Sequence, residues 1–163
     1  ALESGRIPTR ICHNDCNLNN ILFDKKTHKP VAIIDLDTVM PGSVLYDFGD
    51  AIRFGASSAA EDETDLDKVY MDLDMFETYV KGFVGELRDS MTEEEIRSLP
   101  MGAYLMTLET GIRFPGDYLN GDTYFQVHRD KHNLERARAQ LTLALDIEKK
   151  LPEMAEIVKK YVK

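Results

Sequence analysis

Two short segments near the start of the chain contain side chains that could do chemistry together. Residues 13–20 read His-Asn-Asp-Cys-Asn-Leu-Asn-Asn, which places the Asp15 carboxylate and the Asn20 carboxamide five residues apart in a polar stretch. The second segment, Asp35-Leu36-Asp37, supplies acidic groups at the end of an apolar run. The two segments therefore offer oxygen ligands for a divalent metal and a carboxylate that could direct a hydroxyl at a phosphate.

The reaction that best uses these groups is phosphoryl transfer. Such a reaction asks a protein mainly to position the attacking oxygen and to neutralise charge with metal ions. Mg²⁺ keeps much of its water, so one or two carboxylates and a carbonyl oxygen suffice as protein ligands. We predict Asn20 and Asp35 as metal ligands and Asp15 as the group that orients the hydroxyl and accepts its proton. Asp37 is a candidate for a second metal or a supporting position, and His13 is interpreted as a brace for the loop.

These motifs resemble a known family of enzymes. The run His13-x-Asp15-x-x-x-x-Asn20, the Asp35 segment and Tyr46-Asp-Phe-Gly-Asp-Ala51 look like the C-terminal lobe of the aminoglycoside phosphotransferase and choline kinase superfamily, relatives of protein kinases. Two later segments, Thr110-Gly-Ile-Arg113-Phe and Gly121-Asp-Thr-Tyr124-Phe, make the chain most similar to the N-acetylhexosamine 1-kinase group.

The resemblance implies a reaction, a fold and a role for each motif residue. Asp15 becomes the catalytic base, Asn20 and Asp35 bind Mg²⁺, and Asp50 supports the catalytic loop. The fold implied is α+β and mainly helical, a kinase-like C-terminal lobe with a small β-hairpin that carries the catalytic and metal-binding loops. The implied reaction transfers the γ-phosphoryl group of ATP to a hydroxyl of a small molecule, here a sugar.

The resemblance also leads us to expect a second lobe. Kinases of this kind hold ATP with a phosphate loop and a strand lysine in an N-terminal lobe. We find neither feature here, and the catalytic motif lies within the first twenty residues. We therefore expect residues 1–163 to be the catalytic and acceptor-binding lobe, with the nucleotide lobe missing, and we expect this fragment alone to be inactive.

Composition indicates one globular domain and excludes some partners. The 163 residues are 43% hydrophobic, and their number is near the common domain length of about 100–150. The net charge of −9 argues against nucleic acid and anionic membranes, which favour clustered Lys and Arg. No apolar run approaches the roughly 20 residues that span a bilayer, and no signal peptide is recognised, so we predict a cytoplasmic protein.

The two cysteines flank His13 and raise the alternative of a zinc site. Cys12 and Cys16, with His28, could be drawn as ligands. Their spacing is not that of a Cys-x₂-Cys pair, and the sequence has no second pair. We therefore predict reduced thiols that pack around the catalytic loop as small apolar groups.

The pattern of apolar residues predicts a hairpin followed by helices. Residues 21–24 and 31–35 read as strands joined by a polar loop, and their antiparallel pairing would bring Asn20 close to Asp35. Pro41-Gly42 reads as a turn. Helices are predicted at the ranges 46–54, 75–87 and 92–99, with a capping box at Thr92 and Glu95 and a break at Pro100. Further helices are predicted from 101 to an interruption at Pro115, from an Asn133 cap onward, and from Pro152 onward.

The segment between the later helices is the predicted acceptor site. It is rich in polar and aromatic groups around two glycines, as sugar sites often are, and its candidate residues are Arg113, Asp117, Tyr118 and Tyr124. Arg113 is preferred because it closes an apolar helix, where a buried guanidinium needs a partner. The alternative is an ordinary helix end and turn.

Two other functions remain open from the sequence. The acceptor could be choline, an aminoglycoside or a homoserine-like metabolite, and a cationic acceptor would favour an acidic pocket. The chain could instead be a non-catalytic, pseudokinase-like domain that binds a partner. The intact Asp15, Asn20 and Asp35 argue against the second alternative.

Overall fold

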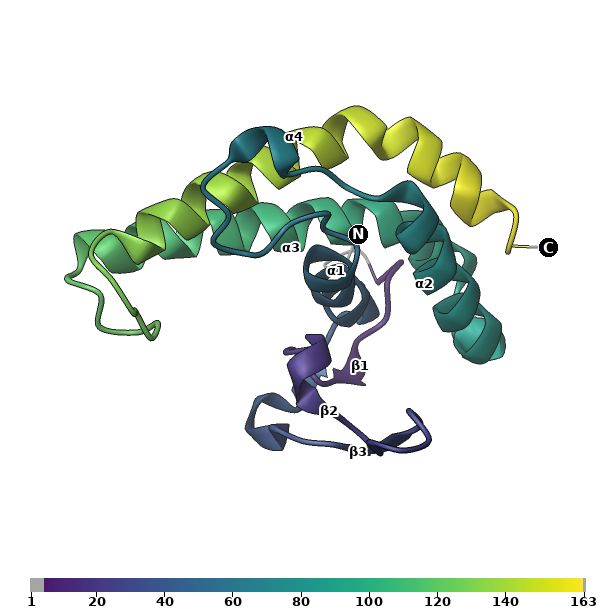
Figure 1. Ribbon diagram of the computed structural model, residues 1–163. Helices are drawn as coiled ribbons and strands as arrows, with labels where there is room; N and C mark the ends of the chain where they lie inside the picture. The colour runs from purple at the N-terminus through teal and green to yellow at the C-terminus, as the bar shows by residue number, and fades with distance from the viewer. Residues whose placement is uncertain (1–4, 163) are drawn as a thin grey trace.

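The computed structural model describes residues 5–162 and consists of helices above two small sheets. Figure 1 shows α3 and α4 running alongside each other, α1 beneath them, and the strands on the far side of α1. This arrangement confirms the predicted α+β, mainly helical lobe with a small hairpin. The elements are β1 Arg10–Cys12, β2 Ile21–Phe23, β3 Pro30–Ile33, β4 Met40–Gly42, α1 Val44–Gly55, α2 Leu73–Leu87, α3 Glu93–Leu119 and α4 His132–Lys159.

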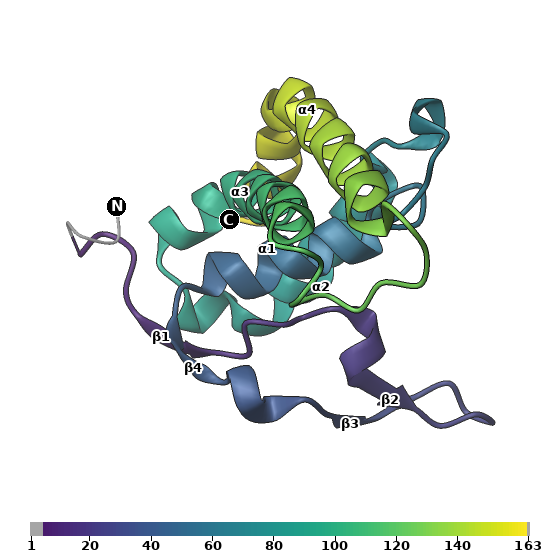
Figure 2. The ribbon, with the colours of Figure 1, turned by 90° about the vertical axis from the view of Figure 1, so that its left-hand side faces the viewer.

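The predicted hairpin is present, and a second strand pair accompanies it. Strands β2 and β3 are antiparallel, with Ile21 opposite Ile33. Strands β1 and β4 also pair antiparallel, with Arg10 opposite Gly42, and Figure 2 shows both pairs on the same side of α1. The turn predicted at Pro41-Gly42 is therefore wrong, because both residues belong to β4. An edge strand tolerates proline, since its outer side needs no hydrogen-bond donor.

Helix α1 is the central element of the core. Ser43 caps its start by accepting a hydrogen bond from the Leu45 N–H at 3.3 Å. Phe48 and Ile52 are fully buried on one face, and the Phe48 ring meets Phe76 and Phe83 of α2 edge-on. This apolar face fixes α1 against the other helices, so that its acidic residues can face the strands.

Helices α1 and α3 cross with their backbones in contact. A Cβ on Gly49 would lie 2.4 Å from the carbonyl oxygen of Gly102, and a Cβ on Gly102 would lie 2.7 Å from that of Leu45. Both distances are far below van der Waals contact, so no side chain fits at either position. Gly49 of the Asp-Phe-Gly-Asp motif is therefore required for packing rather than for chemistry.

Alanine at Gly49 is expected to destabilise the fold by at least about 3 kcal/mol, because the two helices must separate to admit the methyl group. Urea denaturation followed by circular dichroism measures this loss. The matched control is Gly85→Ala on α2, where a Cβ meets nothing within 4 Å. There, the better helix propensity of alanine should stabilise the protein by roughly 0.5–1 kcal/mol. Equal stabilities for the two variants would contradict the close crossing.

The long helices differ from the prediction. Helix α3 passes through Pro100 and Pro115 without ending, and α4 passes through Pro152. The predicted breaks at Pro100 and Pro115 and the predicted helix start at Pro152 are therefore wrong. The predicted Asn133 cap is also wrong, because α4 begins at His132 and its N-cap is Lys131. An interior proline costs about 3 kcal/mol, and the extensive contact between α3 and α4 along their lengths offsets that cost. The described residues include no helix that is both long enough and apolar enough to cross a membrane.

The start of α3 anchors β1. The predicted capping box is confirmed, since the Thr92 hydroxyl accepts from the Glu95 N–H at 3.2 Å and Glu95 accepts from the Thr92 N–H at 2.7 Å. The fully buried Glu95 also accepts two hydrogen bonds from Arg10 of β1, at 2.5 and 2.7 Å. Burial alone would raise the pKa of Glu95, but Arg10 and Thr92 hold it below its ordinary value. The strand that leads into residues 13–20 is thereby tied to the helical layer.

Candidate active site

Residues 13–20 form a tight loop between β1 and β2 that orients Asp15. Its last part, Leu18–Asn20, is a 3₁₀ turn capped by Asn17. The Asp15 carboxylate accepts hydrogen bonds from the side-chain amides of Asn17 at 2.8 Å and of Asn20 at 2.6 Å. Two amides thus fix the direction of this carboxylate.

Asn20 is buried, and its contacts decide which of its atoms could face a cation. Its Nδ2 donates to both the backbone oxygen and the carboxylate of Asp15, at 3.0 and 2.6 Å. This orientation leaves the side-chain Oδ1 as the atom that could bind a metal. The backbone oxygen of Asn20 accepts from the Ile34 N–H at 2.9 Å, so the hairpin brings Asn20 next to the residue that precedes Asp35.

Asp35 lies after the strand rather than at its end. Strand β3 ends at Ile33, and Asp35 caps the short 3₁₀ turn Leu36–Thr38 with a left-handed backbone at φ 62°. Both Asp35 and Asp37 are exposed. A hydrogen bond with Asp37 and repulsion from it raise the pKa of Asp35, with a further contribution from Asp15. The three carboxylates are therefore crowded enough to repel one another.

The donor set fits a metal that shares its ligands with phosphate and water. Asp15, Asp35 and Asp37 line one cavity, yet within residues 5–162 no group of three His, Cys, Asp or Glu side chains could enclose a metal by itself. A hard cation such as Mg²⁺ accepts this arrangement, because it needs only one or two protein oxygens. The Asn20 Oδ1 and the Asp35 carboxylate could supply them.

The cysteines do not offer thiolates at neutral pH. Cys12 is buried beneath the loop, and burial raises the pKa of its thiol to about 11. Burial and the neighbouring Asp47 raise the pKa of Cys16 as well. Their burial and raised pKa values favour neutral thiols that act as small packing residues around the loop.

Asp47 braces the loop from below. Its carboxylate accepts hydrogen bonds from the backbone N–H groups of His13 at 2.9 Å and Asn14 at 2.7 Å. The sequence interpretation assigned the brace to His13 and Asp50 and left Asp47, of the same motif as Asp50, unassigned. A signal was present, because Asp47 is the acidic residue in the first turn of α1, directly after the strands that carry the site.

His13 and Asn14 brace the loop from the other side. The His13 Nε2 lies 3.1 Å from the backbone oxygen of Ile34, and its own carbonyl accepts from the Thr38 hydroxyl at 2.7 Å. The Asn14 amide donates to the backbone oxygen of Thr38 at 3.1 Å. These contacts tie residues 13–20 to the Asp35 segment and set the relative position of the two predicted catalytic motifs.

Asp50 lies one turn beyond Asp47, inside the protein. It is 6% exposed and pairs with Arg53 at 2.9 Å, and Arg53 also pairs with Glu61 at 2.5 Å. Burial raises the pKa of Asp50, while Arg53 and the Cys16 backbone oppose the rise. Asp50 therefore lies beneath the catalytic loop as part of a buried ion-pair group, and it reaches the same cavity as Asp15.

Asp47→Asn is expected to lower the free energy of unfolding by about 1–3 kcal/mol, because one of the two backbone donors loses its acceptor. Urea denaturation measures the change. Asp74→Asn is the control, since it also removes an acid from the first turn of a helix, α2. In that variant the free energy of unfolding should fall by only about 0.3–1 kcal/mol, because only the interaction of the acid with the helix dipole is lost. If the free energy of unfolding fell no more in Asp47→Asn than in Asp74→Asn, the role of Asp47 as the brace would be contradicted.

The cavity beside Asp15 extends to the predicted acceptor residues. It has a volume of about 500 Å³ and is lined by Asp15 and Asp35 at one side and by Arg113, Tyr124 and Phe125 at another. The Arg113 guanidinium lies 5.3 Å from the centres of both the Tyr124 and Phe125 rings. The structure thus brings Arg113 and Tyr124 into the same cavity as Asp15 and Asp35.

Arg113 is not buried, contrary to the prediction. Its side chain is 45% exposed, and its ion pair with Glu109 is long at 3.7 Å. The reason is that α3 continues past Pro115, so Arg113 lies on the side of a helix rather than at a closed end. Its guanidinium is free to contact a molecule in the cavity.

Asp117 and Tyr118 are absent from the lining of this cavity. The Asp117 carboxylate accepts hydrogen bonds from the backbone N–H groups of Thr123, Tyr124 and Phe125 at 2.9–3.0 Å. Of the four predicted acceptor residues, Arg113 and Tyr124 therefore line the cavity, and Asp117 holds the loop that carries Tyr124. The Tyr118 side chain does neither.

A second cavity lies on the other side of the catalytic loop. It measures about 610 Å³ and is lined mainly by apolar groups of the hairpin and α2, including Ile21, Ile33 and Phe83. Asn20 lines this second cavity, and Asp15 lines both. The two predicted metal ligands, Asn20 and Asp35, therefore line different cavities, and Asp15 is common to both.

The segment that contains Asp15 and the elements around it matches a known family of enzymes. Residues 2–77 match the phosphotransferase enzyme family APH. This segment contains the loop, the hairpin, the Asp35 segment and α1, which are the elements that position Asp15. Just under half of the chain is thus similar to a family of phosphotransferases, in the segment where the sequence motifs predicted the resemblance.

Proposed function

We propose that this protein is a small-molecule kinase that transfers the γ-phosphoryl group of ATP to a hydroxyl of a sugar, an N-acetylhexosamine. One observation carries the proposal. Asp15, oriented by two amides, lines a cavity of about 500 Å³ that is also lined by the exposed Arg113 and Tyr124. The proposed base and the proposed acceptor residues thus share one cavity, in a chain whose residues 2–77 match a phosphotransferase family.

In this proposal Asp15 positions the acceptor and takes its proton. The carboxylate accepts a hydrogen bond from the reacting hydroxyl and receives the proton as the oxygen attacks phosphorus. Asn20 keeps the Asp15 side chain in place, and its Oδ1, with the Asp35 carboxylate, would hold Mg²⁺. When bound, Mg²⁺ neutralises charge on the phosphates of ATP. Asp47 and His13 keep the two segments in register.

The aromatic wall of the cavity favours a neutral, hydroxylated acceptor. Of the carboxylates in the lining, those of Asp50 and Glu61 are paired with Arg53, and a bound Mg²⁺ would offset the charge of Asp35. The Tyr124 and Phe125 rings are partnered by Arg113, which leaves no open aromatic cage for an ammonium group. A planar guanidinium beside a ring instead suits the hydroxyls and the apolar face of a sugar. The N-acetyl group rests on the resemblance alone.

The test is an acceptor panel with the full-length natural protein, ATP and Mg²⁺. We expect N-acetylglucosamine or N-acetylgalactosamine to be phosphorylated, and choline, kanamycin and homoserine to react far more slowly. Release of ADP gives the rate, and ³¹P NMR identifies the product. Arg113→Ala should raise the KM for the sugar on the order of tenfold or more, through the loss of charge-assisted hydrogen bonds. Preferential phosphorylation of choline would contradict the choice of acceptor, and no phosphorylation of any alcohol would contradict the kinase.

A further inference from the structure

The loop between α3 and α4 forms one wall of the cavity beside Asp15. It has no helix or strand, yet Tyr124, Phe125, Gln126 and His128 of this loop all line the cavity. The Tyr124 side chain is 73% exposed, so its own packing does not hold it. The position of this wall must therefore come from other contacts of residues 120–131.

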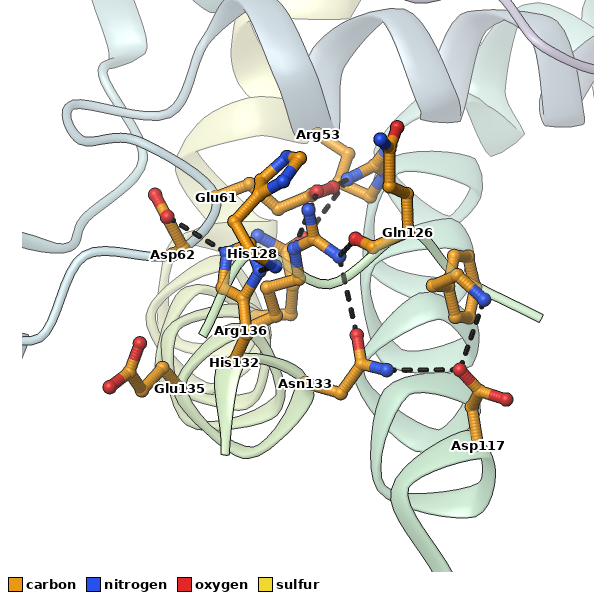
Figure 3. A network of polar contacts seen from close by, with 12 residues as sticks. Arg53, Glu61, Asp62, Asp117, Gln126, His128, His132, Asn133, Glu135 and Arg136 are labelled. Atoms are coloured by element: carbon orange, nitrogen blue, oxygen red, sulfur yellow. Dashed lines mark hydrogen bonds and ion pairs between the residues drawn. The ribbon is translucent and has the colours of Figure 1, made fainter. Parts of the chain in front are cut away.

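Three consecutive residues of the loop are held by one carboxylate. Asp117, in the last turn of α3, accepts the N–H groups of Thr123 and Tyr124 on Oδ1 and that of Phe125 on Oδ2. Asn133, in the first turn of α4, donates to Asp117 Oδ2 at 2.9 Å (Figure 3). Asp117 is 7% exposed and Asn133 is fully buried. We call this pair of residues the clasp.

The clasp also holds Asp122, which lies two residues before Tyr124. The Asn133 Nδ2 donates a second hydrogen bond to the Asp122 carboxylate at 2.8 Å, and Asp122 has a left-handed backbone at φ 56°. Burial alone would raise the pKa of Asp117, but the three backbone N–H groups and Asn133 hold it below its ordinary value. Asp117 is therefore charged at neutral pH, and hydrogen bonds to a charged acceptor are the stronger ones.

Arg136 links the clasp to the centre of the site. Its Nη1 donates to the backbone oxygen of Gln126 at 3.0 Å and to Asn133 Oδ1 at 3.3 Å. Its Nε lies 3.8 Å from Glu61, which pairs with Arg53. Figure 3 shows Arg136, Glu61 and Arg53 close together. Since Arg53 also pairs with Asp50, alternating charges run from Arg136 to Asp50.

His132 provides a second attachment at the far end of the loop. Its Nδ1 accepts the His128 N–H at 3.3 Å, so in the neutral ring Nε2 carries the hydrogen and donates it to Asp62 at 3.0 Å. Figure 3 shows His132 between His128 and Asp62. The loop is thus attached near both ends. The Phe125 ring also packs against Phe114, with ring centres 4.6 Å apart, while the clasp holds the backbone N–H groups of Thr123, Tyr124 and Phe125.

We propose that Asp117 and Asn133 are positioning residues for the acceptor, because they fix the backbone of Thr123–Phe125 and so place the Tyr124 and Phe125 rings and the Arg113 guanidinium beside them. The proposal rests on the proposed function and adds residues that do not touch the acceptor. It predicts that damage to the clasp weakens acceptor binding and leaves nucleotide binding and the chemical step intact.

The first arm of the test is amide hydrogen exchange by NMR on this chain, and it requires no activity. Asp117→Asn keeps the shape of the side chain but replaces an accepting oxygen with a donating NH₂, so N–H groups of the loop lose their acceptor. We expect exchange at Thr123, Tyr124 and Phe125 to accelerate on the order of tenfold or more, while Ile52 in the core is unchanged. Asp130→Asn is the matched control, because it removes the same charge from an exposed site in the same loop.

The second arm is kinetic and uses the full-length natural protein. Asp117→Asn and Asn133→Leu should each raise the acceptor KM on the order of tenfold or more, with kcat and the KM for Mg-ATP within about twofold of the parent. A merely structural role would lower the amount of active enzyme and thus kcat, with both KM values unchanged. Asn133→Leu gives a second reading if Asp117→Asn folds poorly.

The outcomes separate this proposal from the proposed function. Unchanged exchange at the three amides would overturn the clasp whatever reaction the protein catalyses. Accelerated exchange with an unchanged acceptor KM would overturn the positioning role. If the parent phosphorylates no sugar, the proposed function fails, and the exchange arm still decides whether the clasp holds the loop.

Discussion

Asp15→Asn is expected to lower kcat on the order of 10²–10⁴-fold, the usual contribution of a positioned general base. An asparagine keeps the shape of the side chain and can still accept a hydrogen bond from the Asn20 amide, which contacts Asp15 at 2.6 Å in the parent. It cannot take the proton of the acceptor. The KM for Mg-ATP should therefore change little, because the lost group faces the hydroxyl.

Steady-state kinetics of the full-length natural protein, with ATP and acceptor varied in turn, measure this effect. Asp130→Asn serves as the control, because it removes a carboxylate from an exposed position. A kcat within about threefold of the parent would exclude Asp15 as the base, since even a modest general base contributes more.

Asp35→Asn is expected to weaken Mg²⁺ binding and to lower kcat. The variant replaces a charged metal ligand with a neutral one. Even the loss of a residue that only hydrogen-bonds to a ligand costs about 10–100-fold in metal affinity or activity. We expect the Mg²⁺ concentration for half-maximal rate to rise on the order of 10²-fold, with a parallel rise in the KM for Mg-ATP. High Mg²⁺ should restore part of the lost rate.

A Mg²⁺ titration of both variants distinguishes the two carboxylates. Asp67→Asn, in the exposed acidic segment after α1, is the control for a general loss of negative charge. If Asp15→Asn lost its affinity for Mg²⁺ while Asp35→Asn kept it, the two roles would be reversed. Asp37→Asn extends the titration to the neighbouring carboxylate, which shares the cavity with Asp35.

The site depends on helix α1 as well as on the loop that carries Asp15. Helix α1 supplies Asp47 to the backbone of the loop and Asp50 to the group beneath it. Gly49 lies between them and permits the contact with α3. Because successive helical residues point in different directions, three positions within one turn of α1 can brace a loop, pack against a helix and reach a cavity.

The sequence by itself determined the local features of this protein. The hairpin, α1, the capping box at Thr92 and the mainly helical class all follow from patterns spanning a few residues. The spacing of Asp15, Asn20 and Asp35 also sufficed to predict phosphoryl transfer, and the match of residues 2–77 supports a phosphotransferase. Such features are readable because neighbours along the chain decide them.

The tertiary structure decided what depends on distant partners. Sequence rules end a helix at Pro100, Pro115 and Pro152, but the packing of α3 along α4 outweighs the local cost of each proline. That continuity places Arg113 on an open helix side and Asp117 within reach of Asn133, sixteen residues away. Asp117 looked like a sugar contact because a polar loop surrounds it. Whether such a carboxylate meets a ligand or a backbone depends on how the chain returns to it, and that is a property of the fold rather than of any short segment.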